Sequence, residues 1–198
     1  EKATLKAKDL VKMEVAKVGF AEPLMELSAR MTPAALVVGG GITGMVSALS
    51  LAENGFDVHL VEKTPQLGGH ALKIHHTLEG GDVQVYLADL IGKVSRNPQI
   101  HVYKNSQVIA HRGRVGDYTC CIKTVSGEEK EIRHGVTLIA AGGREYEPDE
   151  YLYGQDARVL ISVELEEEID RFSERVAKSK NIVMIQCVGS RNEMRPYC

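Results

Sequence analysis

The stretch Ala34-Ala-Leu-Val-Val-Gly-Gly-Gly-Ile-Thr-Gly44 predicts a short buried strand, a tight glycine turn and the start of a helix. Gly39, Gly41 and Gly44 have the G-x-G-x-x-G spacing of dinucleotide-binding turns. The first glycine permits the turn, the second lets a pyrophosphate approach the backbone, and the third lets the helix pack closely against the strand. The positive end of that helix then points at the phosphates. The stretch therefore predicts a nucleotide-binding α/β unit.

A second motif follows the first along the chain. Residues 57–62 predict a second strand, and Glu62 lies 23 positions after Gly39, where an acidic side chain receives the ribose hydroxyls of an adenine dinucleotide. Gly68 and Gly69 come six and seven positions after Glu62. A second glycine pair permits the close backbone approach that the bulkier FAD needs and a plain NAD-binding unit does not. The two motifs together favour FAD, and a nicotinamide-linked reductase that uses the same turn is the alternative.

The composition excludes several classes of protein. A chain of 198 residues, 43% hydrophobic and 26% charged, can bury a sizeable core and is not disordered as a whole. A net charge of −3, without tryptophan or dense basic runs, argues against nucleic acid as a partner. The sequence has no apolar run of about 18 residues to span a membrane and no signal-peptide core, which favours the cytoplasm. We expect this chain, which begins without methionine, to be a fragment.

The remaining patterns predict a doubly wound parallel sheet with an inserted antiparallel meander. A leader of residues 1–32 contains a predicted helix over about residues 5–28, ahead of a FAD-binding domain over residues 33–160. Within that domain helices and strands alternate, and residues 104–134 show the period of a β-meander. The expected fold class is therefore α/β and Rossmann-like, as in FAD- and NAD(P)-binding proteins.

The C-terminal part, residues 161–198, predicts the start of a second, truncated domain that is NAD-binding-like or iron–sulfur-binding. An acidic amphipathic helix there places Leu165, Ile169 and Phe172 on one face. Residues 180–186 then predict another buried strand, because Ile182–Ile185 within them is an apolar run rich in β-branched side chains.

Four histidine and arginine residues have both a functional and a structural interpretation. Arg144 follows the glycines of the last predicted strand, and it either meets a phosphate or flavin edge or is an exposed surface residue. His70 adjoins the predicted cofactor loop, and it is either part of that site or a solvated or hydrogen-bonded loop residue. His75 and His76 are adjacent, which is a poor spacing for tetrahedral zinc, so we interpret them as solvated or hydrogen-bonded loop residues.

The four cysteines favour thiols or metal ligands over a disulfide framework in a cytosolic chain. Cys120 and Cys121 lie next to each other in a predicted strand, where neighbouring side chains face opposite sides of the sheet. They cannot both ligate one metal ion, so we interpret both as structural cysteines.

The motifs of this chain resemble those of the A subunit of heterodisulfide reductase and of the related quinone-interacting oxidoreductase A subunits. The stretches that carry the resemblance are Gly39–Gly44, Glu62 with Gly68-Gly69, Ala140–Gly143, Gln186–Arg191 and Pro196–Cys198. The resemblance extends over most of the chain, and the run Gln-Cys-Val-Gly-Ser-Arg is much more specific to this family than the glycine turn.

This resemblance implies a FAD-dependent oxidoreductase that relays electrons between a flavin and iron–sulfur clusters, with other redox subunits of a heterodisulfide-reductase-like complex as partners. It also implies that Cys187 and Cys198 begin a cysteine cluster that ligates a [4Fe–4S] centre in the full-length parent. Because such a cluster needs four ligands, the fragment alone is not expected to hold it or to be active. The candidate cofactor-binding residues are Gly39, Gly41, Ile42, Thr43, Gly44, Glu62, Lys63, Gly68, Gly69, His70, Ala141, Gly142 and Arg144.

Two questions stay open at the level of sequence. No residue pattern assigns a catalytic acid or base. A non-catalytic assembly module, which chiefly contacts partner subunits through its leader helix, is an alternative to a flavin-binding redox module.

Overall fold

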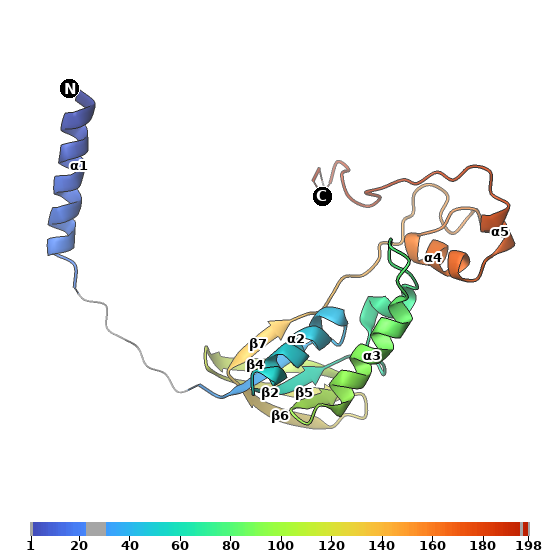
Figure 1. Cartoon of the computed structure of the whole chain (residues 1–198), viewed down its shortest axis with the longest axis horizontal. Coiled ribbons are helices and arrows are strands. Elements are labelled where there is room, and N and C mark those ends of the chain that lie inside the picture. The colour runs from blue at the N-terminus through green and yellow to red at the C-terminus, as the bar shows by residue number, and fades with distance from the viewer. Residues whose placement is uncertain (1, 23–30, 195, 198) are drawn as a thin grey trace. The chain divides into compact units, whose positions relative to one another are not determined.

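The computed structural model describes residues 2–22, 31–194 and 196–197, and the chain divides into two compact units at residue 30. The first unit contains helix α1, Lys2–Gly19 (Figure 1). No described side chain of this helix is buried. The predicted leader helix therefore ends earlier than expected, at a glycine, a residue that loses much conformational entropy in a helix. The last part of the predicted helix, residues 23–28, lies outside the described residues.

The second unit is built on a four-stranded parallel sheet with the strand order β3-β2-β1-β7. Within this sheet Leu36 of the central strand pairs in register with His59 on one side and Thr137 on the other. Because the strands are parallel, their carboxyl ends meet at one edge, which is where α/β folds bind ligands. The predicted parallel sheet is confirmed. Its strands are β1 Ala34–Val38, β2 Asp57–Val61, β3 Ile100–Tyr103 and β7 Val136–Ile139.

Two helices pack against one face of this sheet, namely α2, Ile42–Glu53, and α3, Val83–Arg96 (Figure 1). The core between helices and sheet is apolar: Val37 of β1, Met45 of α2 and Leu60 of β2 are fully buried in it. Burial of side chains of this kind stabilises a fold by about 1.5–3 kcal/mol each. The shared core therefore fixes α2 against β1, with the glycine turn at the carboxyl end of the strand.

The opposite face of the sheet is covered by the predicted antiparallel meander, with the strand order β4-β5-β6. Leu36 and Val61 of the parallel sheet share an apolar cluster with Cys120, Ile122 and Ile132 of the meander. Cys120 is buried and Cys121 is only partly buried, as expected for neighbours on opposite faces of a strand. The meander strands are β4 Ser106–Arg114, β5 Asp117–Thr124 and β6 Glu129–His134.

In the C-terminal part the predicted helix forms but ends before Phe172, and the prediction of a buried strand is wrong. Helix α4, Ser162–Asp170, forms, but it has no buried residue, and Phe172 lies beyond its end with 91% of its surface exposed. A carboxylate of this helix accepts backbone N–H groups of a loop far away in the sequence. The run Ile182–Ile185 is not a strand, and its side chains are 52–83% exposed, because no described strand pairs with it. A short helix, α5, Glu174–Ala177, precedes that run.

Among the described residues, no helix combines the length and the apolar character that crossing a membrane requires.

Candidate dinucleotide-binding site

The glycine turn after β1 has the geometry that its spacing predicts. Gly39 has φ +112°, a left-handed conformation, and a Cβ on it would overlap the carbonyl oxygen of Ala140 after β7. A Cβ on Gly44 would overlap the carbonyl oxygen of Gly39. Both positions therefore require glycine for folding, since backbone atoms of the turn occupy the space of a side chain.

Gly41 has a different role, because nothing lies within 4 Å of the place where its Cβ would be. It is the residue before α2, and the first turn of α2 has neither a side-chain cap nor an acidic residue. The side chains of Ile42 and Thr43 at this end are exposed. The open space and the uncapped N–H groups at the positive end of α2 are what a phosphate group needs.

The second glycine pair lies against this turn. The N–H of Gly68 donates to the carbonyl of Gly40 at 2.8 Å, and Gly41 and Gly68 form an isolated parallel bridge. A Cβ on Gly69 would lie 3.2 Å from the Cα of Gly41, closer than side chains normally pack. The two sequence motifs thus meet in space as one glycine-lined surface, and the short 3-10 helix η1, Gly69–Lys73, leaves from it.

Glu62 lies directly after β2, and only 6% of its surface is exposed. Its Oε2 accepts the N–H of Gly40 at 2.6 Å, and its Oε1 accepts the N–H and the hydroxyl of Thr64, each at 2.8 Å. Burial alone would raise the pKa of Glu62, but the hydrogen bonds from Thr64 and Gly40 outweigh it and lower the pKa below its usual value. The site therefore contains a buried carboxylate that stays ionised.

The other candidate residues surround this surface without a direct bond to it. Lys63 and His70 are exposed on either side of the loop that carries the glycine pair. Ala141, Gly142 and Arg144 are exposed after β7, whose end is tied to β1 by the N–H of Ala140 donating to Val38. The structure places Arg144 on the surface at the same edge of the sheet as the glycine turn.

Sequence reasoning missed the residues that hold Glu62. Thr64 lies only two positions after Glu62, the spacing at which Asp and Asn side chains accept a backbone N–H in tight turns, so the sequence offered a local signal for this contact. The donation from Gly40 was not predictable, because it depends on how two separate loops meet. Ser106, at the start of β4, also donates its N–H to the carbonyl of Glu62 at 3.0 Å, so the meander supports the same residue.

Helix α4 is clamped to the loop that follows η1. Glu166 accepts the N–H groups of His75 at 2.8 Å and His76 at 3.0 Å, and Asp170 lies 3.3 Å and 3.5 Å from ring nitrogens of the same two histidines. The hydrogen bond from His76, then that from His75, lowers the pKa of Glu166. Both histidines are hydrogen-bonded loop residues, as predicted.

The two cysteines expected to ligate a cluster lie near the C-terminal end of the chain. Cys187 is exposed in a loop, and Cys198 lies outside the described residues. Across residues 2–22, 31–194 and 196–197, no three His, Cys, Asp or Glu side chains are arranged to hold a metal ion.

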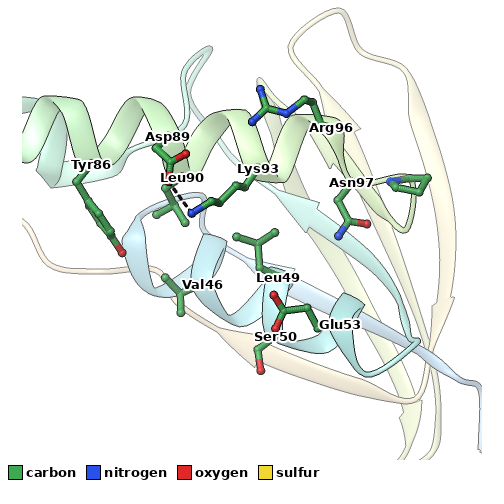
Figure 2. Close-up of a pocket in the computed structure, with 11 residues that line it drawn as sticks. Val46, Leu49, Ser50, Glu53, Tyr86, Asp89, Leu90, Lys93, Arg96 and Asn97 are labelled. Atoms are coloured by element: carbon green, nitrogen blue, oxygen red, sulfur yellow. Dashed lines mark ion pairs between the residues drawn. The ribbon is translucent and has the colours of Figure 1, made fainter.

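An open groove also lies between α2 and α3, away from the glycine turns (Figure 2). Val46 and Leu49 of α2 face Tyr86 of α3 across it, and the ion pair of Asp89 with Lys93, 2.6 Å long, lies along its α3 side. This groove has no glycine turn, uncapped helix start or ionised buried carboxylate, so the features that suit a dinucleotide are at the sheet edge.

The comparisons with known proteins agree with this geometry. Residues 37–103, which include both glycine motifs and Glu62, match the family model of an NAD(P)-binding Rossmann-like domain. The chain is 42% identical over 123 residues to an A-type iron-sulfur subunit of CoB–CoM heterodisulfide reductase from Methanopyrus kandleri, and the alignment covers 62% of this chain and 19% of that protein. The chain is a homologue of the heterodisulfide reductase A subunits.

A second relative matches the whole chain. The A subunit of H(2):CoB-CoM heterodisulfide,ferredoxin reductase from Methanothermobacter thermautotrophicus is 26% identical, and the alignment covers all of this chain and 44% of that protein. This chain thus spans less than half the length of these two curated relatives. Among solved structures it is similar to L-proline dehydrogenase from P. horikoshii, with 21% identity, a TM-score of 0.49, and coverage of 62% of this chain and 25% of that one.

Proposed function

We propose that this homologue of the heterodisulfide reductase A subunits is a FAD-binding oxidoreductase module, which relays electrons from its flavin to iron–sulfur clusters in a heterodisulfide-reductase-like complex. The observation that supports it most is the contact between the two glycine motifs, beside a carboxylate that stays ionised. The identity with curated A subunits supports an oxidoreductase role in heterodisulfide reduction. The cytoplasm is the proposed location.

The residues of this chain would bind and orient the dinucleotide. The pyrophosphate fits the open space at Gly41, where the uncapped start of α2 favours negative charge. The ribose hydroxyls fit Glu62, and Gly68 and Gly69 let the second loop lie directly against the phosphate turn, because a side chain at Gly69 would meet Gly41 and one at Gly68 would meet Leu72. The flavin itself supplies the electron chemistry when bound, while the protein positions it and excludes competing reactions.

The iron–sulfur part of the proposal concerns the full-length parent. Cys187 is exposed, which suits a thiolate that shares a cluster with cysteines elsewhere in a longer chain. We propose Cys187 and Cys198 as two of the four ligands of a [4Fe–4S] cluster, and other redox subunits as the partners that exchange electrons with it.

The test is reconstitution with excess FAD, followed by desalting, an absorbance spectrum and mass analysis of the released chromophore. The proposal predicts retained flavin bands and released FAD. Gly41→Val should abolish retention, because a side chain would fill the open space for the pyrophosphate. Gly19→Val, at a glycine of α1 that also has open space, is the matched control and should retain FAD. A colourless wild-type chain, or one that binds NADH more tightly than FAD, would contradict the proposal.

A further inference from the structure

We propose that Thr64 is the positioning residue of this site: it holds the Glu62 carboxylate in the orientation in which one oxygen receives a ribose hydroxyl. The inference rests on the proposed function and names a residue that no sequence motif includes. Thr64 does not contact the dinucleotide in this proposal, since it acts through Glu62.

The first argument is the number of hydrogen bonds that the carboxylate can accept. An ionised carboxylate has about four lone-pair sites on its two oxygens. Oε1 accepts the N–H and the hydroxyl of Thr64, and Oε2 accepts the N–H of Gly40. Three of the four sites are thus used by the protein, and the remaining one is on Oε2, the oxygen next to the glycine turn. The two donors from Thr64 fix the rotation of the carboxylate that presents this site.

The second argument is that Thr64 is itself held in place. Its carbonyl accepts the N–H of Asn105 at 3.1 Å, directly before β4, and the neighbouring Ser106 binds the carbonyl of Glu62. The meander therefore supports both Thr64 and Glu62, although the side chain of Thr64 lies on the surface. A donor anchored in this way can keep a buried carboxylate in one orientation.

The third argument concerns the single proton of the Thr64 hydroxyl. Its Oγ1 lies 2.8 Å from both Oε1 of Glu62 and the carbonyl oxygen of Gln66, yet it can donate fully to one acceptor only. An ionised carboxylate accepts more strongly than a neutral carbonyl. The hydroxyl therefore turns to Glu62 while Glu62 is charged, and it favours the charged form. An ionised carboxylate here accepts an unphosphorylated ribose and repels a 2′-phosphate.

The experiment compares Thr64→Val, which removes the hydroxyl and keeps the N–H, with Thr64→Ser, which keeps both. Glu62 is titrated by carbon-13 NMR of the side-chain carboxyl, with Glu62→Gln to assign the signal. FAD affinity is measured from pH 7 down to about pH 4, a range that reaches the usual pKa of a glutamate side chain. Thr77→Val is the matched control, because the Thr77 hydroxyl accepts the N–H of Gly81 and does not touch Glu62.

The expected result is that Thr64→Val raises the pKa of Glu62, weakens FAD binding about tenfold at neutral pH, and makes binding fall at a higher pH than in the wild type. Thr64→Ser and Thr77→Val should behave like the wild type. An unchanged carboxyl titration and pH profile in Thr64→Val would overturn the inference. A wild-type chain that binds neither FAD nor NAD would overturn the proposed function, and the ribose role with it. The carboxyl titration would still show whether Thr64 holds Glu62.

Discussion

Two apolar runs of this chain have the same sequence pattern and different structures. Ala34–Val38 and Ile182–Ile185 are both short, continuous, rich in β-branched or aliphatic residues, and followed within a few residues by glycine. The first is β1, with Leu36 and Val37 fully buried. The second is not a strand and is at least 52% exposed at every side chain.

The difference between the two runs is the presence of partners. β1 pairs with β2 and β7, and it is covered by α2 on one face and by the meander on the other. Ile182–Ile185 pairs with no described strand and belongs to no described core. An apolar run gains free energy only when its surface leaves water and its backbone groups find partners. The pattern therefore indicates that a segment can form a strand. The strand forms only where neighbouring elements pair with it and cover it.

The two runs should differ most in how much stability the chain loses when one of their side chains is truncated. Leu36→Ala creates a cavity between β1 and the meander, and we expect it to lower the free energy of unfolding by about 2–5 kcal/mol. Ile182→Ala removes an exposed side chain, so we expect a change within about 0.5 kcal/mol. Urea unfolding followed by circular dichroism measures both. Similar losses from both substitutions would show that the second run is buried.

The glycines that follow the two runs should also differ. Gly44→Ala places a methyl group on the carbonyl of Gly39, and displacing α2 should cost about 1–3 kcal/mol. Gly189→Ala puts alanine at φ +77° near the ring of Tyr146, a side chain on the surface. The strain of about 1 kcal/mol arises at a residue outside both described cores. The midpoint of the main unfolding transition should therefore stay unchanged. A shift of the midpoint in Gly189→Ala as large as that in Gly44→Ala would contradict this view.

The paired sheet should contribute to the dependence of stability on pH, whereas the run Ile182–Ile185 has no ionisable side chain. His59 of β2 is in register with Leu36, and its ring stacks on His101 at 5.2 Å. Burial, then the nearby His101 and Lys130, lowers the pKa of His59 to about 4. The unfolded chain therefore binds more protons than the folded chain between pH 6.5 and about 4, so stability falls as the pH falls through that range.

We expect a loss of about 1 kcal/mol between pH 7.5 and pH 5, after allowance for solvent screening of this partly exposed group. His59→Gln should reduce the slope of the profile above pH 5, and the buried His134, whose pKa burial also lowers, should account for part of the slope that remains. Unfolding by urea at each pH measures the slope. If the free energy of unfolding of the wild-type chain stayed constant down to pH 5, this would contradict the claim that His59 is neutral in the folded chain because it is partly buried.

The fold could be predicted from sequence wherever local sterics or burial decide it. Gly39 and Gly44 are required by backbone contacts at the turn, so their spacing predicted the turn, and Glu62 followed from the length of the β–α–β unit. The contact of Gly41 with Gly68 and the donation of Gly40 to Glu62 could not be predicted, because they depend on how two loops meet. The sequence pattern identified the residues, and tertiary structure decided which of them touch.

In the C-terminal part, the sequence pattern did not identify the residues that make the tertiary contacts. The sequence pattern placed the apolar side chains of α4 on one face, but the helix is hydrogen-bonded in place by Glu166, and Asp170 lies beside the same loop. Carboxylates dock here because backbone N–H groups of His75 and His76 need acceptors. Charge patterns alone do not reveal such partners, which come from a loop about 90 residues away.

The most direct measurement of the central claim is a titration of the nitrogen-15 labelled chain with FAD, followed by amide NMR. Binding at the sheet edge predicts that the amide signals of Gly40, Gly41, Thr43 and Gly69 shift first and saturate together, while those of the α2–α3 groove, such as Asp89 and Lys93, stay in place. Shifts confined to that groove, or no shifts at all at saturating FAD, would contradict the claim that the joined glycine motifs form a dinucleotide site.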